Sequence, residues 1–227
     1  MDSNAQRKGS RMAGNRVQLI EGDCLTELPK LGDGLAKLVL ADPPYGIGYK
    51  DTAGRTVKND EHPFIWWLAE AYRVTSDRGA LFCFCRWDVQ EAFRIAIASA
   101  GFTVRSQVIW VKRGGGQGGI RNQASPSHEV AWFATKGSFR FPGKRLDSVL
   151  EARRPPSQRR THPTEKPVAL LRTILESTTA PGDLVVDPFM GSGASAVAAN
   201  LTHRKYWGCE LDPSYVAAAR FRVGSGR

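Results

Sequence analysis

Two short motifs contain the residues best suited to chemistry, and each one follows a hydrophobic run. The first motif, at 42–45, reads Asp-Pro-Pro-Tyr after the run 38–41. The second, at 187–193, reads Asp-Pro-Phe-Met-Gly-Ser-Gly after the run 184–186. In open α/β sheets, ligands bind beyond the carboxyl ends of the strands. The motifs therefore predict a crevice that receives a carboxylate from each of two strands.

The first motif is suited to holding a flat exocyclic amine. Methylation of such an amine is difficult because the nitrogen lone pair is delocalised into the ring, and two acceptors for its N–H groups favour a pyramidal nitrogen. We expect the Asp42 carboxylate and the Pro43 carbonyl to be these acceptors, with Pro43 and Pro44 fixing the backbone. Tyr45 would stack on a base swung out of its helix. Taken alone, the motif is equally compatible with a structural Pro-Pro turn.

The second motif predicts a nucleotide-type cofactor site. Its glycines let the backbone approach a ligand, and the alanine-rich helix expected at 194–201 offers free N–H groups at its start. Glu210, roughly twenty residues further on, would accept hydrogen bonds from ribose hydroxyls, and Asp23 from an adenine amino group. NAD is disfavoured because Ser195 or Ala196 stands where the dinucleotide motif has its third glycine.

Strand-like and helix-like segments alternate along the chain. This alternation predicts an α/β fold with a mostly parallel sheet, in one domain over 17–227 after a polar tail at 1–16. The expected strands are 17–21, 37–41, 80–85, 104–111, 129–134, 183–187 and 205–209. The expected helices, from apolar residues at helical spacing, are 64–75, 89–100, a helix after Lys166-Pro167, 194–201 and a helix that opens at Asp212-Pro213.

The charge of the chain is basic and unevenly spread. Its formal net charge is +10, and residues 136–160 hold eight Lys or Arg against two acids. Such a balance favours a polyanionic partner. The four cysteines are not at zinc-ligand spacing, so no metal is expected. No apolar run approaches the roughly 20 residues of a membrane span, and no secretory signal is present, so we expect a cytoplasmic protein.

The combination and order of the two motifs is similar to that of the β-class amino methyltransferases of DNA. The element 162–167, His-Pro-Thr-Glu-Lys-Pro, resembles another motif of this family, and the resemblance covers about residues 17–220. It implies a Rossmann-like, S-adenosylmethionine-dependent methyltransferase fold. That fold has a mostly parallel seven-stranded sheet, helices on both faces and a circularly permuted motif order.

The resemblance also implies roles for individual residues. The catalytic tetrapeptide would be Asp42, Pro43, Pro44 and Tyr45. The S-adenosylmethionine site would comprise Asp23, Cys24, Asp42, Thr164, Lys166, Asp187, Pro188, Phe189, Gly191, Ser192, Gly193 and Glu210, with Thr164 and Lys166 beside the methionine end. DNA-recognition loops are expected at 46–59, 113–127 and 137–160, with phosphate contacts from Arg113, Arg121, Arg140, Lys144 and Arg145.

The activity implied is methylation of adenine N6 in double-stranded DNA, since aspartate in the first position of the tetrapeptide is commoner in the adenine enzymes. Methylation of cytosine N4 is the nearest alternative, and methylation of RNA or of protein glutamine is a more distant one. A nucleotide-binding oxidoreductase and a non-catalytic DNA-binding protein fit the motifs less well. A solitary prokaryotic or phage methylase is expected, without a helicase or endonuclease segment. Because the chain leaves little room for target recognition, a homodimer is expected to hold the duplex.

Overall fold

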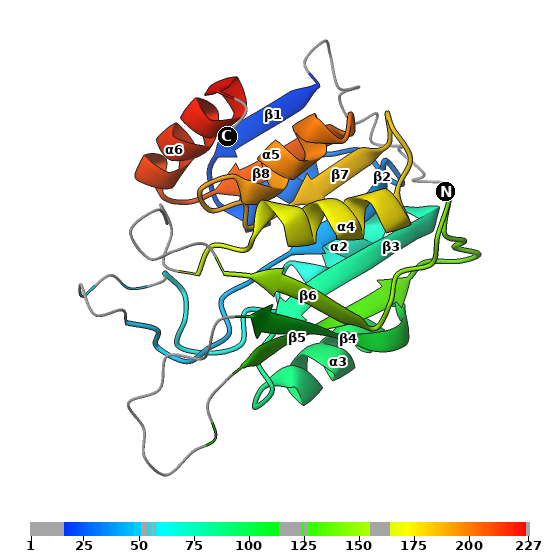
Figure 1. Cartoon of the computed structure of the whole chain (residues 1–227), viewed down its shortest axis with the longest axis horizontal. Helices are drawn as coiled ribbons and strands as arrows, with labels where there is room; N and C mark the ends of the chain where they lie inside the picture. Colours follow the sequence, from blue (N-terminus) through cyan, green and yellow to red (C-terminus); the bar gives the residue numbers. More distant parts are fainter. Residues whose placement is uncertain are drawn as a thin grey trace, which may run out of the picture.

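The structure is a computed structural model that describes residues 16–50, 54, 56, 58–113, 124, 127–154 and 164–225. Within these residues, eight strands form one sheet with the order β1-β8-β7-β2-β3-β5-β4-β6 (Figure 1). All neighbouring strands are parallel except that β5 runs against β3 and β4. The strands are β1 (Val17–Glu21), β2 (Ala36–Ala41), β3 (Thr75–Cys85), β4 (Thr103–Arg113), β5 (His128–Thr135), β6 (Val149–Arg153), β7 (Leu184–Asp187) and β8 (Lys205–Glu210).

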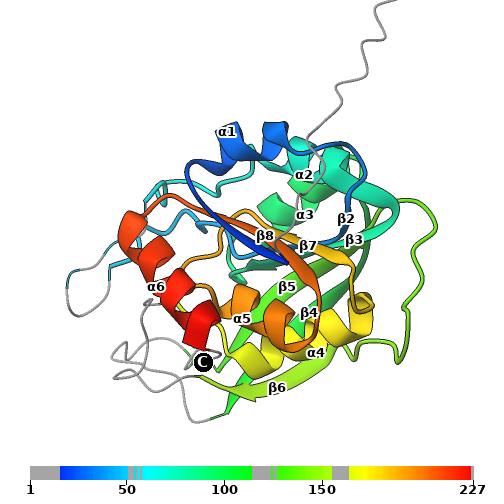
Figure 2. The ribbon, with the colours of Figure 1, turned by 90° about the horizontal axis from the view of Figure 1, so that it is seen from above.

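Helices cover both faces of this sheet (Figure 2). One layer contains α1 (Cys24–Glu27), the short 3-10 helix η1 (Leu28–Lys30), α2 (Leu68–Val74) and α3 (Gln90–Ser99). The other contains α4 (Val168–Thr178), α5 (Ala194–Leu201) and α6 (Pro213–Ser225). No helix of the described residues is long and apolar enough to cross a membrane. The expected α/β fold with a mostly parallel sheet is confirmed.

The sequence of β3 shows how one strand serves both layers. Leu81, Cys83 and Cys85 belong to the core beneath α1–α3, whereas Phe82 and Phe84 belong to the core beneath α4–α6. Successive side chains of a strand point to opposite faces, so a strand buried on both faces reads as a continuous apolar run. The same geometry buries both β3 cysteines on one face, and they are free thiols.

The sheet has one strand more than the seven expected. The additional strand, β6, lies in the basic segment 137–160, which was expected to be a recognition loop. Within β6 only Leu150 is buried, so the strand has no alternating pattern to reveal it. It forms because its backbone pairs with β4, with Val149 opposite Ile109. Tertiary pairing, rather than local sequence, therefore creates this strand.

The helix expected at 64–75 is shorter in the structure, and the next strand is longer. α2 begins only at Leu68, and β3 begins at Thr75 instead of at residue 80. Phe64 and Trp67 continue the apolar stripe from a turn outside the helix, where both pack edge-on against Phe189. The packing of Phe64 and Trp67 against Phe189 therefore explains why their apolar spacing is helical although they lie outside the helix.

Candidate active site

One cavity of about 1100 Å³ lies at the carboxyl ends of the parallel strands and receives both motifs. The two motifs come together because they follow β2 and β7, which are hydrogen-bonded neighbours in the sheet. The predicted residues that line the cavity are Asp23, Cys24, Asp42, Pro43, Pro44, Tyr45, Thr164, Lys166, Asp187, Pro188, Phe189, Gly191, Ser192 and Glu210. These residues, distant in sequence, thus line one continuous cavity.

At one end of the cavity, Asp42 is held by two partners. Lys166 Nζ lies 2.5 Å from Asp42 Oδ2, and the Tyr45 hydroxyl donates to Oδ1. The Tyr45 ring is braced edge-on by Phe93, with 6.5 Å between the ring centroids. Burial raises the pKa of the Asp42 carboxyl, while the Lys166 charge opposes that shift. Each carboxylate oxygen has a second lone pair, so Asp42 can still accept from a ligand.

A second carboxylate, which the sequence analysis did not identify, completes this charged group. Glu129 Oε1 lies 2.8 Å from Lys112 Nζ, and its Oε2 lies 3.2 Å from Lys166 Nζ in a geometry that makes no hydrogen bond. Burial alone would raise the pKa of Glu129, but Lys166 and Lys112 outweigh it and lower that pKa to about 2. Burial likewise works to lower the pKa of Lys166, but Asp42 and Glu129 outweigh it and raise that pKa. The two carboxyl groups of Asp42 and Glu129 are thus matched by the two amino groups of Lys112 and Lys166.

The loop after the tetrapeptide is fixed by another unpredicted acid, Asp60. Its two carboxylate oxygens accept from the backbone N–H groups of Gly46 and Tyr49, each at 2.7 Å. The Phe64 N–H donates to the Pro44 carbonyl at 3.2 Å. Asp60 is only 3 % exposed, so these bonds are shielded from water. They set the path of the chain as it leaves the tetrapeptide.

On the neighbouring strand β7, Asp187 has no cationic partner among the described residues. Its carboxylate accepts from Ser195 Oγ at 2.5 Å, from the Phe189 N–H at 2.9 Å and from the Tyr206 hydroxyl at 3.2 Å. Burial raises the pKa of Asp187 to about 7, although these hydrogen bonds work against the shift. This aspartate shapes the turn between β7 and α5 by hydrogen bonding rather than by ion pairing.

The loop between β7 and α5 is also tied to the end of β8. Glu210 Oε2 accepts from the Gly191 N–H at 3.0 Å, and its Oε1 accepts from the Asp212 N–H at 2.9 Å. Asp23, at the end of β1, caps α1 by accepting from the Leu25 N–H at 2.9 Å. Both acids thus have backbone partners while lining the cavity, and each keeps lone pairs for a ligand.

Gly193 does not line the cavity, unlike the other residues predicted to bind the cofactor. It caps α5 with a φ of 82°, and a Cβ built there would lie 2.6 Å from the Ala219 Cβ on α6. Its role in binding the cofactor stays a prediction, and in the structure Gly193 permits the turn and the close packing of two helices.

The element 162–167 is described from Thr164 onward, and it is anchored by a residue that the sequence analysis passed over. Glu165 accepts from Ser192 Oγ at 3.1 Å and pairs with Arg222 on α6 at 3.0 Å. This buried bond joins the element to the glycine-rich loop, while the adjacent Lys166 reaches Asp42. Paired polar residues of this kind have no periodicity in the sequence, which is why Glu129, Lys112, Asp60 and Glu165 were missed.

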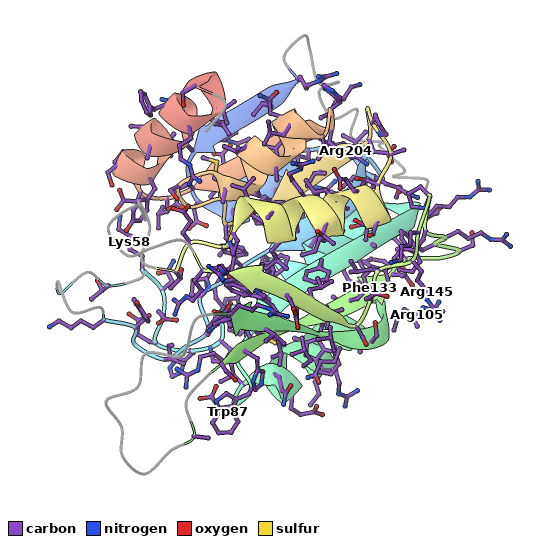
Figure 3. The ribbon with its side chains drawn as sticks, in the orientation of Figure 1. Lys58, Trp87, Arg105, Phe133, Arg145 and Arg204 are labelled. Carbon is purple, nitrogen blue, oxygen red and sulfur yellow. The ribbon has the colours of Figure 1, made fainter. Side chains whose placement is uncertain are left out.

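The expected phosphate contacts are not gathered at the cavity. Lys136 and Ser138 donate to the carbonyls of Gly79 and Asp77 near the start of β3, whereas the cavity lies beyond its end. β3 has 11 residues, a length of roughly 35 Å. The segment after β5 therefore lies at the opposite end of the sheet, and Figure 3 shows Arg145 on the side of the molecule away from Lys58.

This placement separates three of the five candidates, Arg140, Lys144 and Arg145, from the site. Arg113 lies at the cavity end of β4 but pairs with Glu151 and does not line the cavity. Arg121 and most of the loop 113–127 are outside the described residues. The described cations that do line the cavity are Lys58, Arg86, Lys112, Arg154 and Lys166.

No group of three or more His, Cys, Asp or Glu side chains is arranged to hold a metal ion within the described parts of the chain. The cavity instead suits an organic ligand with a ribose and a charged end. Backbone N–H groups, buried carboxylates and aromatic rings line it, and its volume exceeds that of a single drug-sized ligand. These residues fit a nucleoside cofactor together with a base.

Comparison with known proteins agrees with this geometry. The family model described as DNA methylase (N6/N4 type) matches residues 36–221. The YubD methylase of Escherichia coli K12 is 34% identical over 212 residues, which are 92% of this chain and 90% of that protein. The DNA adenine methyltransferase YhdJ of the same organism is 26% identical, over 91% of this chain and 82% of that protein.

Solved structures show the same fold. The complex of M1.HpyAVI with S-adenosylmethionine has a TM-score of 0.73 at 23% identity, covering 91% of this chain and 99% of that one. The cytosine-N4-specific PvuII DNA methyltransferase also has a TM-score of 0.73, at 20% identity, covering 92% of this chain and 86% of that one. The chain belongs to the N6/N4 DNA methylase family, and it is a DNA methyltransferase whose cofactor is S-adenosylmethionine.

Proposed function

We propose that this protein methylates the N6 amine of adenine in double-stranded DNA, acting on a base flipped into the cavity. The observation that carries the proposal is the charged group around Asp42. The Asp42 carboxylate pairs with the Lys166 ammonium, and in its ionised form it is an acceptor only, which is what an exocyclic amine with two N–H donors requires.

The residues of the chain divide the work between the two ends of the cavity. The Asp42 carboxylate and the Pro43 carbonyl accept the two amine hydrogens, so the nitrogen lone pair is withdrawn from the ring. Tyr45, braced by Phe93, stacks on the flipped base and keeps its hydroxyl on Asp42. Asp42 also receives the proton that the nitrogen loses once it is methylated. These groups are prepositioned, so little reorganisation is needed during the reaction.

The cofactor is held at the other end. S-Adenosylmethionine, when bound, supplies an electrophilic methyl group on a sulfonium. Glu210 accepts from its ribose hydroxyls and Asp23 from its adenine amine, while the turn at Gly191 lets the backbone come close. Thr164 and Lys166, which both line the cavity, would lie at the methionine end, and Lys166 pairs with Asp42. The two sites therefore meet at Asp42.

Two observations favour adenine, and one leaves cytosine N4 as the second candidate. Asp42 opens the tetrapeptide, as is commoner in adenine enzymes, and YhdJ is named an adenine methyltransferase. The similarity in fold to the cytosine-specific PvuII enzyme means that the fold itself accommodates either base. Protein glutamine is disfavoured because such enzymes usually have asparagine at this position.

Mass spectrometry of nucleosides tests the proposal. Duplex oligonucleotides are incubated with the protein and S-adenosylmethionine and then digested. N6-methyldeoxyadenosine is the expected product. N4-methyldeoxycytidine, or methylation of RNA alone, would overturn it. Single-molecule sequencing of DNA from cells that express the protein would give the target sequence.

We further propose that the active form is a homodimer of a solitary methylase from a prokaryote or phage. A chain of 227 residues presents a small surface for recognising a duplex. Light scattering during size-exclusion chromatography gives the mass in solution. A monomer that is fully active at nanomolar concentration would contradict the dimer.

A further inference from the structure

Trp87 is an exposed aromatic side chain that the site described above does not use. It follows β3 directly, lines the cavity and is 62% exposed. Among the described residues, the only other exposed large apolar side chain that lines the cavity is Leu211, at 38%. Figure 3 shows Trp87 at the edge of the molecule, projecting away from the sheet. An exposed aromatic ring that lines an active-site cavity can stack on a partner that approaches the cavity.

The backbone at Trp87 is fixed by contacts between the residues that flank it in the chain. Arg86 and Asp88 form a two-pronged ion pair, with Nε to Oδ1 at 3.1 Å and Nη2 to Oδ2 at 2.7 Å. The Val89 N–H donates to the Arg86 carbonyl at 3.3 Å and closes the turn before α3. Trp87 therefore projects from a braced turn between a central strand and a helix. This fixed turn keeps the Trp87 side chain in position when it contacts a partner.

The partner that fits Trp87 is the base stack of duplex DNA. Moving a nucleotide into the cavity leaves a gap in the helix and costs unpairing and unstacking energy. Apolar side chains inserted between bases, and aromatic rings stacked on them, recover part of this cost. Arg86 and Lys58 line the same cavity with side chains 39% and 58% exposed, and their positive charges suit the flanking phosphates.

We propose that Trp87 stacks on the DNA bases next to the flipped nucleotide and so stabilises the flipped state. This inference rests on the proposed base-flipping function and names the residue that sustains it. Trp87 is thus a positioning residue: it acts on the DNA helix, whereas Asp42 and Tyr45 act on the target base.

Kinetics on two substrates test the proposal, with Trp87→Ala compared to Trp66→Ala. Trp66 is a matched control because it is also exposed but does not line the cavity. On an intact duplex, Trp87→Ala should lower kcat/KM by about 10- to 100-fold, the usual contribution of one stacked base. On a duplex with an abasic site opposite the target, where the pair is already broken, the loss should shrink to about 3-fold or less. Trp66→Ala should match the wild type on both.

A Trp87→Ala variant as active as the wild type on the intact duplex would overturn the proposal. An equal loss on both substrates would also overturn it, because the role would then not concern the gap in the helix.

Fluorescence titration tests the contact without relying on the identity of the modified base. Duplex DNA should quench part of the tryptophan emission of the wild type and of Trp66→Phe, and most of this quenching should disappear in Trp87→Phe. Unchanged quenching in Trp87→Phe would overturn the contact. If the wild type methylates cytosine, the proposed base is wrong, yet this titration still decides the role of Trp87.

Discussion

Asp42 directly follows β2 and Asp187 ends the neighbouring strand β7, but their surroundings differ. Asp42 faces an ammonium group at 2.5 Å and belongs to a balanced set of two anions and two cations. Asp187 is surrounded by hydroxyl and N–H groups and has no cation beside it in the described structure. The same residue type at equivalent positions is thus tuned for different tasks. We infer that an ion-paired acceptor serves the base, and a hydrogen-bonded carboxyl shapes the cofactor loop.

The largest effect is expected when the base-facing carboxylate is removed. Asp42→Ala should lower the rate of methyl transfer by at least about 10³-fold, because prepositioned polar groups of this kind contribute 10²–10³ each and Asp42 also receives the proton. Single-turnover assays with saturating S-adenosylmethionine measure the chemical step. Turnover close to that of the wild type would break the assignment of Asp42.

Replacing Lys166 by an uncharged residue should destabilise the fold, because the Asp42 carboxylate would lose its cationic partner. Lys166→Met should lower the free energy of unfolding by about 3 to 5 kcal/mol. The double variant Lys166→Met/Asp42→Asn should recover part of this loss, because the uncompensated charge is gone. Urea unfolding of the wild type, both single variants and the double variant gives the coupling. Additive losses would show that Asp42 and Lys166 do not interact strongly.

The pKa of Asp187 predicts a dependence of stability on pH. Because that pKa is about 7 in the folded protein, against an ordinary value of 3.8, the folded state binds the proton more tightly than the unfolded state. The stabilisation that results from this proton binding is fully present below the pKa that Asp187 has in the unfolded state. It is lost as the pH rises through 7. Between about pH 5 and pH 8 the wild type should lose roughly 2 to 3 kcal/mol relative to Asp187→Asn. Urea unfolding across this pH range measures the loss of stability. Parallel plots of unfolding free energy against pH for the two proteins would refute the raised pKa of Asp187.

The smallest effect is expected from the basic segment far from both aspartates. Neutralising Arg140, Lys144 and Arg145 together should leave DNA affinity and its salt dependence nearly unchanged, because the structure places them at the other end of the sheet. Replacing Lys58 and Arg86 by Gln should reduce the salt slope by up to about 2. Fluorescence anisotropy at several salt concentrations distinguishes the two sets. A reduced slope for the distant triple variant would move the DNA interface to that end.

The sequence predicted those features that local pattern controls. Buried strands such as β2 and β7 appear as apolar runs, and the motifs after them could be placed at one edge of the sheet. The short strand β6 could not be predicted, because its pairing with β4 rather than its own composition makes it a strand. Compositional clustering likewise could not place Arg145, since adjacency in sequence does not say at which end of the sheet a loop lies.

The charged partners of the site required three-dimensional information. Glu129 is the second residue of β5, a strand whose pattern indicates only burial, and its role appears once β5 brings it between Lys112 and Lys166. Asp60 likewise becomes important only through the loop that it ties to the tetrapeptide. The motifs identified the chemistry, and the fold supplied the ion pairs that sustain it.

One measurement tests the division between the two aspartates most directly: calorimetric titration of S-adenosylhomocysteine into Asp42→Ala and Asp187→Ala, with circular dichroism to verify folding. We predict that Asp42→Ala binds within about 3-fold of the wild-type affinity. Asp187→Ala should bind at least about 10-fold more weakly, because the loop hydrogen bonds to its carboxylate are lost. The reverse order of affinities would contradict the account.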